Sequence, residues 1–115
     1  MSRDSMLLIV NPQSGKKQGI KVAKKIKTYL LQFNIIIDIF YTEYPGHAKK
    51  YLLTLKSNFY TSIIVLGGDG TINEIINGIL QRNDEYLPTL GLLPGGTGNA
   101  FLHDLNLLEP IKALD

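Results

Sequence analysis

Hydrophobic residues in this 115-residue chain alternate between short continuous runs and helical spacing. Four aliphatic runs have the length and β-branched character of buried strands, and apolar residues at helical spacing follow them. The predicted strands cover residues 6–10, 35–41, 61–66 and 89–93. Strand and helix in alternation are typical of right-handed crossovers. We therefore predict an α/β fold of three layers, with a parallel-rich sheet and helices on both faces.

The predicted helices occupy the segments between these strands. Helical spacing is clearest after the third strand, where one amphipathic helix is expected to present Ile72, Ile75, Ile76, Ile79 and Leu80. Earlier helices carry apolar positions at Val22, Ile26, Tyr29 or Leu30 and Phe33, and at Ala48, Tyr51, Leu52 and Leu55. A fourth helix is expected after "PGGTGN". The final segment "LLEPIKALD" begins another helical pattern without a cap, so we expect residues 1–115 to be one domain of a longer protein.

Composition narrows the class of protein. With 44% hydrophobic and 19% charged residues, the chain has the composition of a soluble globular domain. It contains no cysteine, which excludes disulfides and thiolate metal sites. No apolar run approaches the ~20 residues of a membrane helix. We expect a cytoplasmic protein.

Positive charge is concentrated in one segment. Half of the twelve basic residues lie within residues 16–27, where there is no acidic residue. They are Lys16, Lys17, Lys21, Lys24, Lys25 and Lys27. One interpretation is a solvated helix face, and the other is attraction to phosphates or to an anionic membrane surface.

Glycine-containing loops follow the carboxyl end of every predicted strand: "NPQSG", "TEYPGH", "GGDGT" and "PGGTGN". In open parallel sheets, ligands bind at this edge. Glycines at 67, 68 and 70 would let backbone amides approach an anion at the start of the next helix. Thr71 could cap that helix or donate to a phosphate oxygen. The alternative is a tight connection that needs positive φ.

The two most familiar phosphate motifs do not fit these loops. A P-loop requires lysine after its last glycine, where this chain has Thr97. The dinucleotide fingerprint requires a third glycine, where this chain has Asn73 or Phe101. A phosphate site in this chain must be of another kind.

Asp69 lies within the glycine loop and would repel a phosphate unless a cation lay between them. We therefore expect it to hold Mg²⁺, although it could instead close its own turn. Asn73 and Glu74 could add polar contacts nearby. His47 and His103 lack neighbours at metal-ligand spacing and are interpreted as structural.

"GGDGTINE", the later "PGGTGN", the earlier "NPQSG" and the pattern T-x-x-x-G-H-A together resemble the diacylglycerol kinase catalytic family. That family includes bacterial lipid kinases, sphingosine kinases and ceramide kinases. "GGDGT" alone also occurs in NAD kinases and some phosphofructokinases, but the four motifs in order are specific. The resemblance covers residues 6–108.

The resemblance implies an ATP-dependent kinase that phosphorylates a lipid hydroxyl, with a nucleotide-binding domain like that of NAD kinase and a β-rich second domain. The general base would lie in the second domain, so these 115 residues would be inactive alone. Motif matching places the ATP contacts at Asn11, Pro12, Gln13, Ser14, Gly15, Thr42, Gly67, Gly68, Asp69, Gly70, Thr71, Ile72, Asn73, Glu74, Gly96 and Thr97. The implied partners are ATP, Mg²⁺ and a lipid at the membrane surface, with peripheral membrane association and no nucleic acid.

One departure leaves the lipid open. Many members continue "GTGN" with Asp-Phe-Ala, whereas residues 100–102 here are Ala-Phe-Leu, closer to sphingoid-base kinases. A kinase of the NAD kinase type is a weaker alternative, because "PGGTGN" belongs to the lipid branch. A non-catalytic nucleotide-binding module is the third. We also expect self-association through the end near "LLEPIKALD", where a missing domain would leave apolar surface exposed.

Overall fold

The computed structural model describes residues 5–13, 17–57 and 59–94. Its four strands form one parallel sheet in the order β2-β1-β3-β4. The elements are β1 (Met6–Val10), α1 (Gly19–Leu31), β2 (Ile37–Tyr41), α2 (His47–Thr54), β3 (Ser62–Gly67), α3 (Asp69–Leu80) and β4 (Thr89–Pro94). The predicted α/β fold is confirmed, and the strand ends differ by one or two residues. The predicted fourth helix and the final segment lie outside the described residues.

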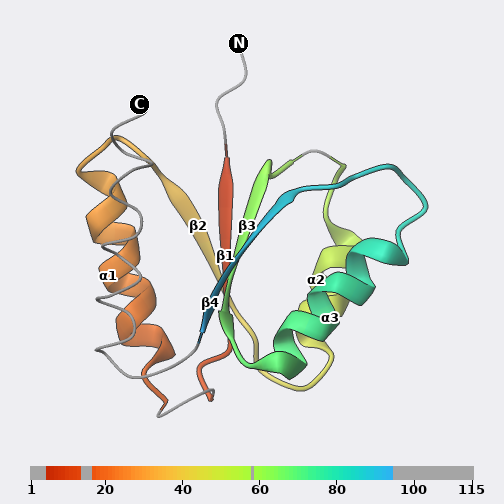
Figure 1. Cartoon of the computed structure of the whole chain (residues 1–115), viewed down its shortest axis with the longest axis horizontal. Coiled ribbons are helices and arrows are strands. Elements are labelled where there is room, and N and C mark those ends of the chain that lie inside the picture. Colours follow the sequence, from red (N-terminus) through yellow and green to blue (C-terminus); the bar gives the residue numbers. More distant parts are fainter. Residues whose placement is uncertain (1–4, 14–16, 58, 95–115) are drawn as a thin grey trace.

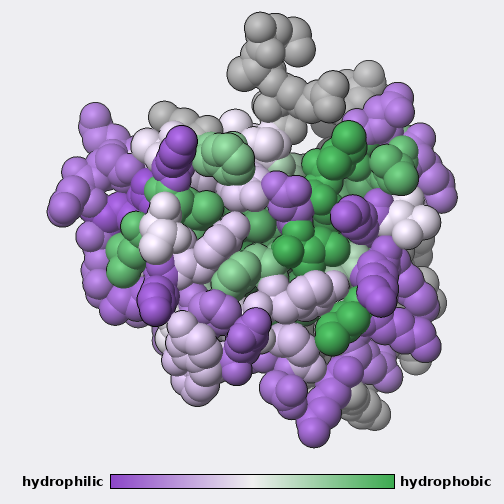
Figure 2. Space-filling view, turned by 180° about the vertical axis from the view of Figure 1, so that it is seen from behind, coloured by the Kyte–Doolittle hydropathy of each residue, from purple (hydrophilic) through white to green (hydrophobic). Residues whose placement is uncertain are grey.

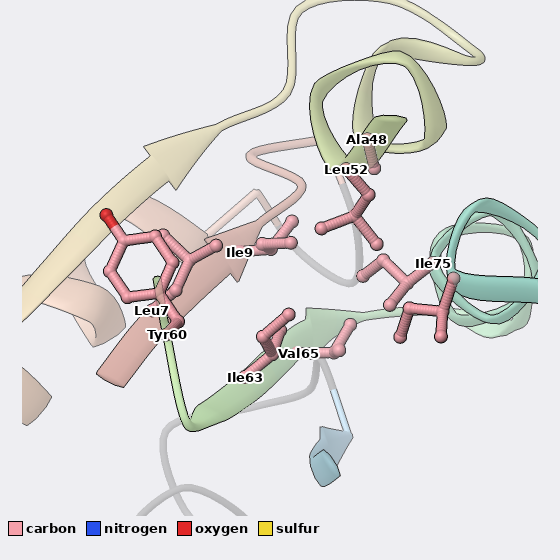
Figure 3. Close-up of a cluster of buried hydrophobic side chains, with 9 residues drawn as sticks. Leu7, Ile9, Ala48, Leu52, Tyr60, Ile63, Val65 and Ile75 are labelled. Atoms are coloured by element: carbon pink, nitrogen blue, oxygen red, sulfur yellow. The ribbon is translucent and has the colours of Figure 1, made fainter. Parts of the chain in front are cut away.

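The helices cover both faces of the sheet, with α1 on one side and the pair α2 and α3 on the other (Figure 1). Side chains alternate along a strand, so the two central strands β1 and β3 each contribute to two cores. Leu7 and Val65 point toward α2 and α3, whereas Leu8 and Leu66 point toward α1. Figure 3 shows the first core, in which strand residues meet Ala48, Leu52 and Ile75 of the two helices. The alternation of apolar residues on both faces explains why these strands appear as continuous hydrophobic runs.

The buried face of α3 differs from the one that the isoleucine spacing predicts. Ile75 and Ile79 are buried, but Ile76 and Leu80 are 38% and 71% exposed. Thr71 takes an inward position instead. The hydrophobic pattern therefore predicted α3 and three of its inward residues correctly, since Ile72 also packs against the core, and Ile76 and Leu80 were wrong.

Gly78 is buried and turned toward α2. A Cβ there would lie 3.2 Å from the Cβ of Leu52 and 3.4 Å from the backbone of Lys49. The absence of a side chain lets the two helices approach closely. This contact fixes α2 against α3 and so places their amino ends beside each other.

Hydrophobic side chains stay exposed at both edges of the sheet, among them Ile36 beside β2 and Leu92 on β4. The side of the molecule seen in Figure 2 carries hydrophobic residues in its middle, with hydrophilic ones on both flanks. Such surfaces are compatible with association. Self-association of the chain stays a prediction.

Candidate ligand-binding cleft

A cleft of about 610 Å³ opens at the carboxyl edge of the sheet. Its described lining comes from the loops after β1 and β2, the start of α3 and one residue of α1. The residues are Asn11, Pro12, Gln13, Ile20, Thr42, Glu43, Tyr44, Pro45, Gly70, Thr71 and Glu74. Three of the four loops that the sequence singled out therefore meet in one place. The fourth, "PGGTGN", lies outside the described residues except for Pro94, which ends β4.

The glycines at the junction of β3 and α3 are not there for positive φ. Gly68 is extended, with φ −91° and ψ −172°, and α3 begins at the next residue. Among the described glycines, positive φ occurs at Gly46, which precedes α2. The alternative of a turn that needs left-handed backbone is therefore wrong for this junction.

Gly67 and Gly70 each have a separate reason to lack a side chain. A Cβ at Gly67 would lie 3.1 Å from the hydroxyl oxygen of Thr71, so this glycine makes room for a neighbouring side chain. A Cβ at Gly70 would meet no other described part of the chain within 4 Å, and Gly70 lines the cleft. The first glycine serves packing, and the second leaves backbone open to the cleft.

Thr71 is buried at the third position of α3, so the prediction that it caps this helix is wrong. Its hydroxyl oxygen accepts a hydrogen bond from Asn11 Nδ2 at 3.3 Å. Asn11 Oδ1 in turn accepts one from the backbone N–H of Gln13 at 3.0 Å. Asn11 thus ties the loop after β1 to the start of α3. The Thr71 hydroxyl proton is not used in the bond with Asn11.

Glu74 occupies the amino end of the neighbouring helix. Its carboxylate accepts hydrogen bonds from the backbone N–H of Gly46 at 3.0 Å and of Ala48 at 3.2 Å. Gly46 is the N-cap residue of α2 and Ala48 lies in the first turn, and the N-cap residue itself makes no side-chain capping bond. Glu74 therefore caps α2 from α3, while it also lines the cleft.

Asp69 is exposed in the first turn of α3 and does not line the cleft. The described residues contain no group of three or more acidic, histidine or cysteine side chains that could hold a metal ion. A single carboxylate suits Mg²⁺ that takes its remaining ligands from phosphate oxygens and water. The metal role of Asp69 stays a prediction.

The other predicted contacts are divided between the cleft and its surroundings. Thr42 lines the cleft. Ile72 packs against the core, and Asn73 is exposed without lining the cleft. Residues 14, 15, 96 and 97 lie outside the described part of the chain.

Residues 43–45 and Ile20 line the cleft but were not predicted to do so. The signal for 43–45 was available, because they lie between Thr42 and "GHA" in a loop that was expected at this edge. Ile20 has no such signal, since the pattern of α1 reports which residues face the sheet and not which lie at its open end.

Polar side chains near the amino ends of the strands, opposite the cleft, form two hydrogen-bonded pairs. Tyr60 donates to Asp38 at 2.6 Å, and burial together with this bond raises the pKa of Tyr60. Arg82 pairs with Asp84 at 2.6 Å, and this hydrogen bond lowers the pKa of Asp84 to about 2. Tyr60 is thus paired with Asp38 and Arg82 with Asp84, as is typical of polar groups that stabilise a fold.

Comparison with known proteins decides the family. The family model of the diacylglycerol kinase catalytic domain matches residues 5–115. The chain belongs to this family. It is 35% identical over 112 residues to sphingosine kinase B of Dictyostelium discoideum, covering 92% of this chain. It is also 35% identical over 111 residues to sphingosine kinase 1 of Arabidopsis thaliana, again covering 92% of this chain.

A solved structure shares the fold of this diacylglycerol kinase catalytic domain. The crystal structure of a diacylglycerol kinase from Bacillus anthracis aligns with a TM-score of 0.68 at 34% identity, covering 97% of this chain. The chain spans 40% of that protein, and 14% and 22% of the two sphingosine kinases. No helix in the described ranges is both long and apolar enough to cross a bilayer.

Proposed function

We propose that the chain is the nucleotide-binding part of an ATP-dependent lipid kinase, and that its cleft holds ATP. Membership of the diacylglycerol kinase catalytic family supports the reaction class. The proposal that the cleft holds ATP is supported mainly by the uncapped start of α3. Within the described chain, no side chain caps this helix, and Gly70 of its first turn lines the cleft. The amides of Gly70 and Thr71, which no described side chain caps, and the positive end of the helix dipole suit a phosphate.

The residues around this helix start have complementary roles in the proposal. The amides of Gly70 and Thr71 would bind phosphate oxygens, and the Thr71 hydroxyl proton would add a third donor. Asn11 would position Thr71 through the hydrogen bond between them. Thr42 lines the same cleft and would contact the nucleotide.

Asp69 would hold Mg²⁺ beside these phosphates. The ion would offset the repulsion between the carboxylate and the triphosphate, and it would neutralise charge during transfer. The residues outside the described part of the chain at 14, 15, 96 and 97 would complete the site, as the family motifs imply. The general base and the lipid pocket would lie in a second domain.

The lipid substrate would be reached at a membrane surface, to which the protein binds peripherally. Exposed lysines on α1 support this part of the proposal, because no acidic residue lies in the first turn and none interrupts the helix. They are Lys21, Lys24, Lys25 and Lys27. A positive helix face of this kind is attracted to anionic headgroups.

The function is tested by phosphate transfer from labelled ATP to diacylglycerol and to sphingosine, with a protein that includes the whole catalytic region. We expect transfer to one of the two lipids, and expect Asp69→Asn to abolish most of it without changing the thermal midpoint. Normal turnover of Asp69→Asn at saturating Mg·ATP would contradict the metal role. Transfer to neither lipid, with phosphorylation of NAD instead, would contradict the lipid kinase.

A further inference from the structure

An aromatic stack leads from the core of the protein to the wall of the cleft. Phe40 and Tyr51 pack against the first core and stack on each other, with ring centroids 3.8 Å apart and planes 3° apart. The ring of His47 meets Phe40 edge-on at 4.8 Å. Tyr44 stacks on His47, with ring centroids 4.3 Å apart and an interplanar angle of 12°. Tyr44 is the outermost ring and lines the cleft.

His47 is held in a defined orientation. Its Nδ1 accepts a hydrogen bond from the backbone N–H of Glu43 at 2.9 Å. A neutral imidazole with Nδ1 as acceptor carries its proton on Nε2. Because the hydrogen bond and the Phe40 contact fix His47, the stacked ring of Tyr44 is also oriented, although 47% of that residue is exposed.

The lining of the cleft contains both hydrogen-bond donors, which suit a triphosphate, and apolar surface, which suits a nucleobase. Amides and hydroxyls come from the start of α3 and from Thr42, whereas apolar surface comes from Pro12, Ile20, Tyr44 and Pro45. A triphosphate needs donors, and a nucleobase needs a flat apolar surface. An oriented aromatic ring provides such a surface with little loss of side-chain entropy on binding.

We propose that the ring of Tyr44, backed by His47, stacks on the nucleobase. This inference rests on the proposed function, since it needs a nucleotide in the cleft. Every base has a π face, so stacking contributes affinity without strong selection among bases. Tyr44 would therefore strengthen binding of purine nucleotides in general, while the phosphates bind elsewhere in the cleft.

The test compares ligands with and without a base by calorimetry in the presence of Mg²⁺. The ligands are ATP, GTP and inorganic triphosphate, and the protein is the full 115-residue chain. Tyr44→Leu should weaken ATP and GTP by about tenfold and leave triphosphate binding unchanged. Tyr44→Phe keeps the ring and should recover most of that loss. Phe59→Leu is the matched control, since it removes an exposed aromatic ring outside the cleft lining and should change nothing.

The wild-type chain provides a second readout that does not depend on how a variant folds. The ring protons of Tyr44 should move upfield when ATP is added and stay in place with triphosphate. Equal ATP affinity of wild type and Tyr44→Leu, or equal weakening of ATP and triphosphate, would overturn the stacking role. If the wild-type chain bound triphosphate but neither ATP nor GTP, the stacking role would also be overturned. If the wild type binds none of the ligands, the proposed function fails and this inference fails with it.

Discussion

The amino ends of α2 and α3 lie beside the same cleft but are occupied differently. In α2, the N–H groups of Gly46 and Ala48 donate to the carboxylate of Glu74. In α3, no described side chain accepts from the first turn, and Gly70 lines the cleft. Glu74 itself is a residue of α3. One helix therefore supplies the anion that caps its neighbour, while no side chain of the described residues caps its own amino end.

The positive amino end of a helix can stabilise the fold or can bind a ligand, and we propose that α2 and α3 differ in this respect. An anion at a helix start is stabilising, commonly by about 0.3–1 kcal/mol for a charged side chain. In α2 the carboxylate of Glu74 provides that stabilisation. In α3 we propose that the amides of Gly70 and Thr71 bind a phosphate, which would supply the same interaction on binding.

The largest effect is expected when α3 is given its own anion. Gly70→Asp places a carboxylate where the phosphates of ATP are proposed to bind, and a Cβ has space there. We expect ATP affinity, measured by calorimetry, to fall at least about tenfold because of charge repulsion. The thermal midpoint should stay the same or rise. Asn77→Asp is the control, because it adds the same charge to an exposed α3 residue outside the cleft lining. Equal loss in both variants would point to net charge and not to the helix start.

A smaller effect, on stability, is expected at the amino end of α2, which Glu74 caps. Glu74→Ala removes both hydrogen bonds to the start of α2, and the free energy of unfolding should fall by about 1–2 kcal/mol. Glu74→Gln keeps an acceptor oxygen and should lose roughly half as much. Urea denaturation measures both, with exposed Glu85→Ala as the neutral control. An unchanged midpoint for Glu74→Ala would show that the cap adds nothing to stability.

The smallest effect separates two glycines of α3. Gly78→Ala should lower the free energy of unfolding by about 1 kcal/mol, because its Cβ would press on Leu52 and on the backbone of Lys49. Gly70→Ala has open space and should be neutral or more stable by up to about 0.5 kcal/mol. Both are measured in the same urea series. A loss of stability in Gly70→Ala equal to that in Gly78→Ala would mean that the start of α3 is closely packed.

The sequence predicted the strands of the sheet well, and it predicted the packing of α3 and the role of Glu74 less well. Strands with apolar residues on both faces are visible as continuous runs, as for Ile63 to Leu66 of β3. The inward face of α3 was predicted only in part, because it also contains polar Thr71 and Gly78, which a hydrophobic pattern does not count. The role of Glu74 could not be inferred, since its partners lie 26 and 28 residues away and meet it only in the fold.

We expect phosphate to bind at the start of α3 and not at that of α2. Amide NMR of the ¹⁵N-labelled chain, titrated with inorganic triphosphate and Mg²⁺, tests it residue by residue. We predict saturable shifts at Gly70 and Thr71, with Gly46 and Ala48 unchanged because Glu74 already occupies their end. Shifts centred on Gly46 and Ala48, or saturation without any change at Gly70, would show that phosphate does not bind at the start of α3.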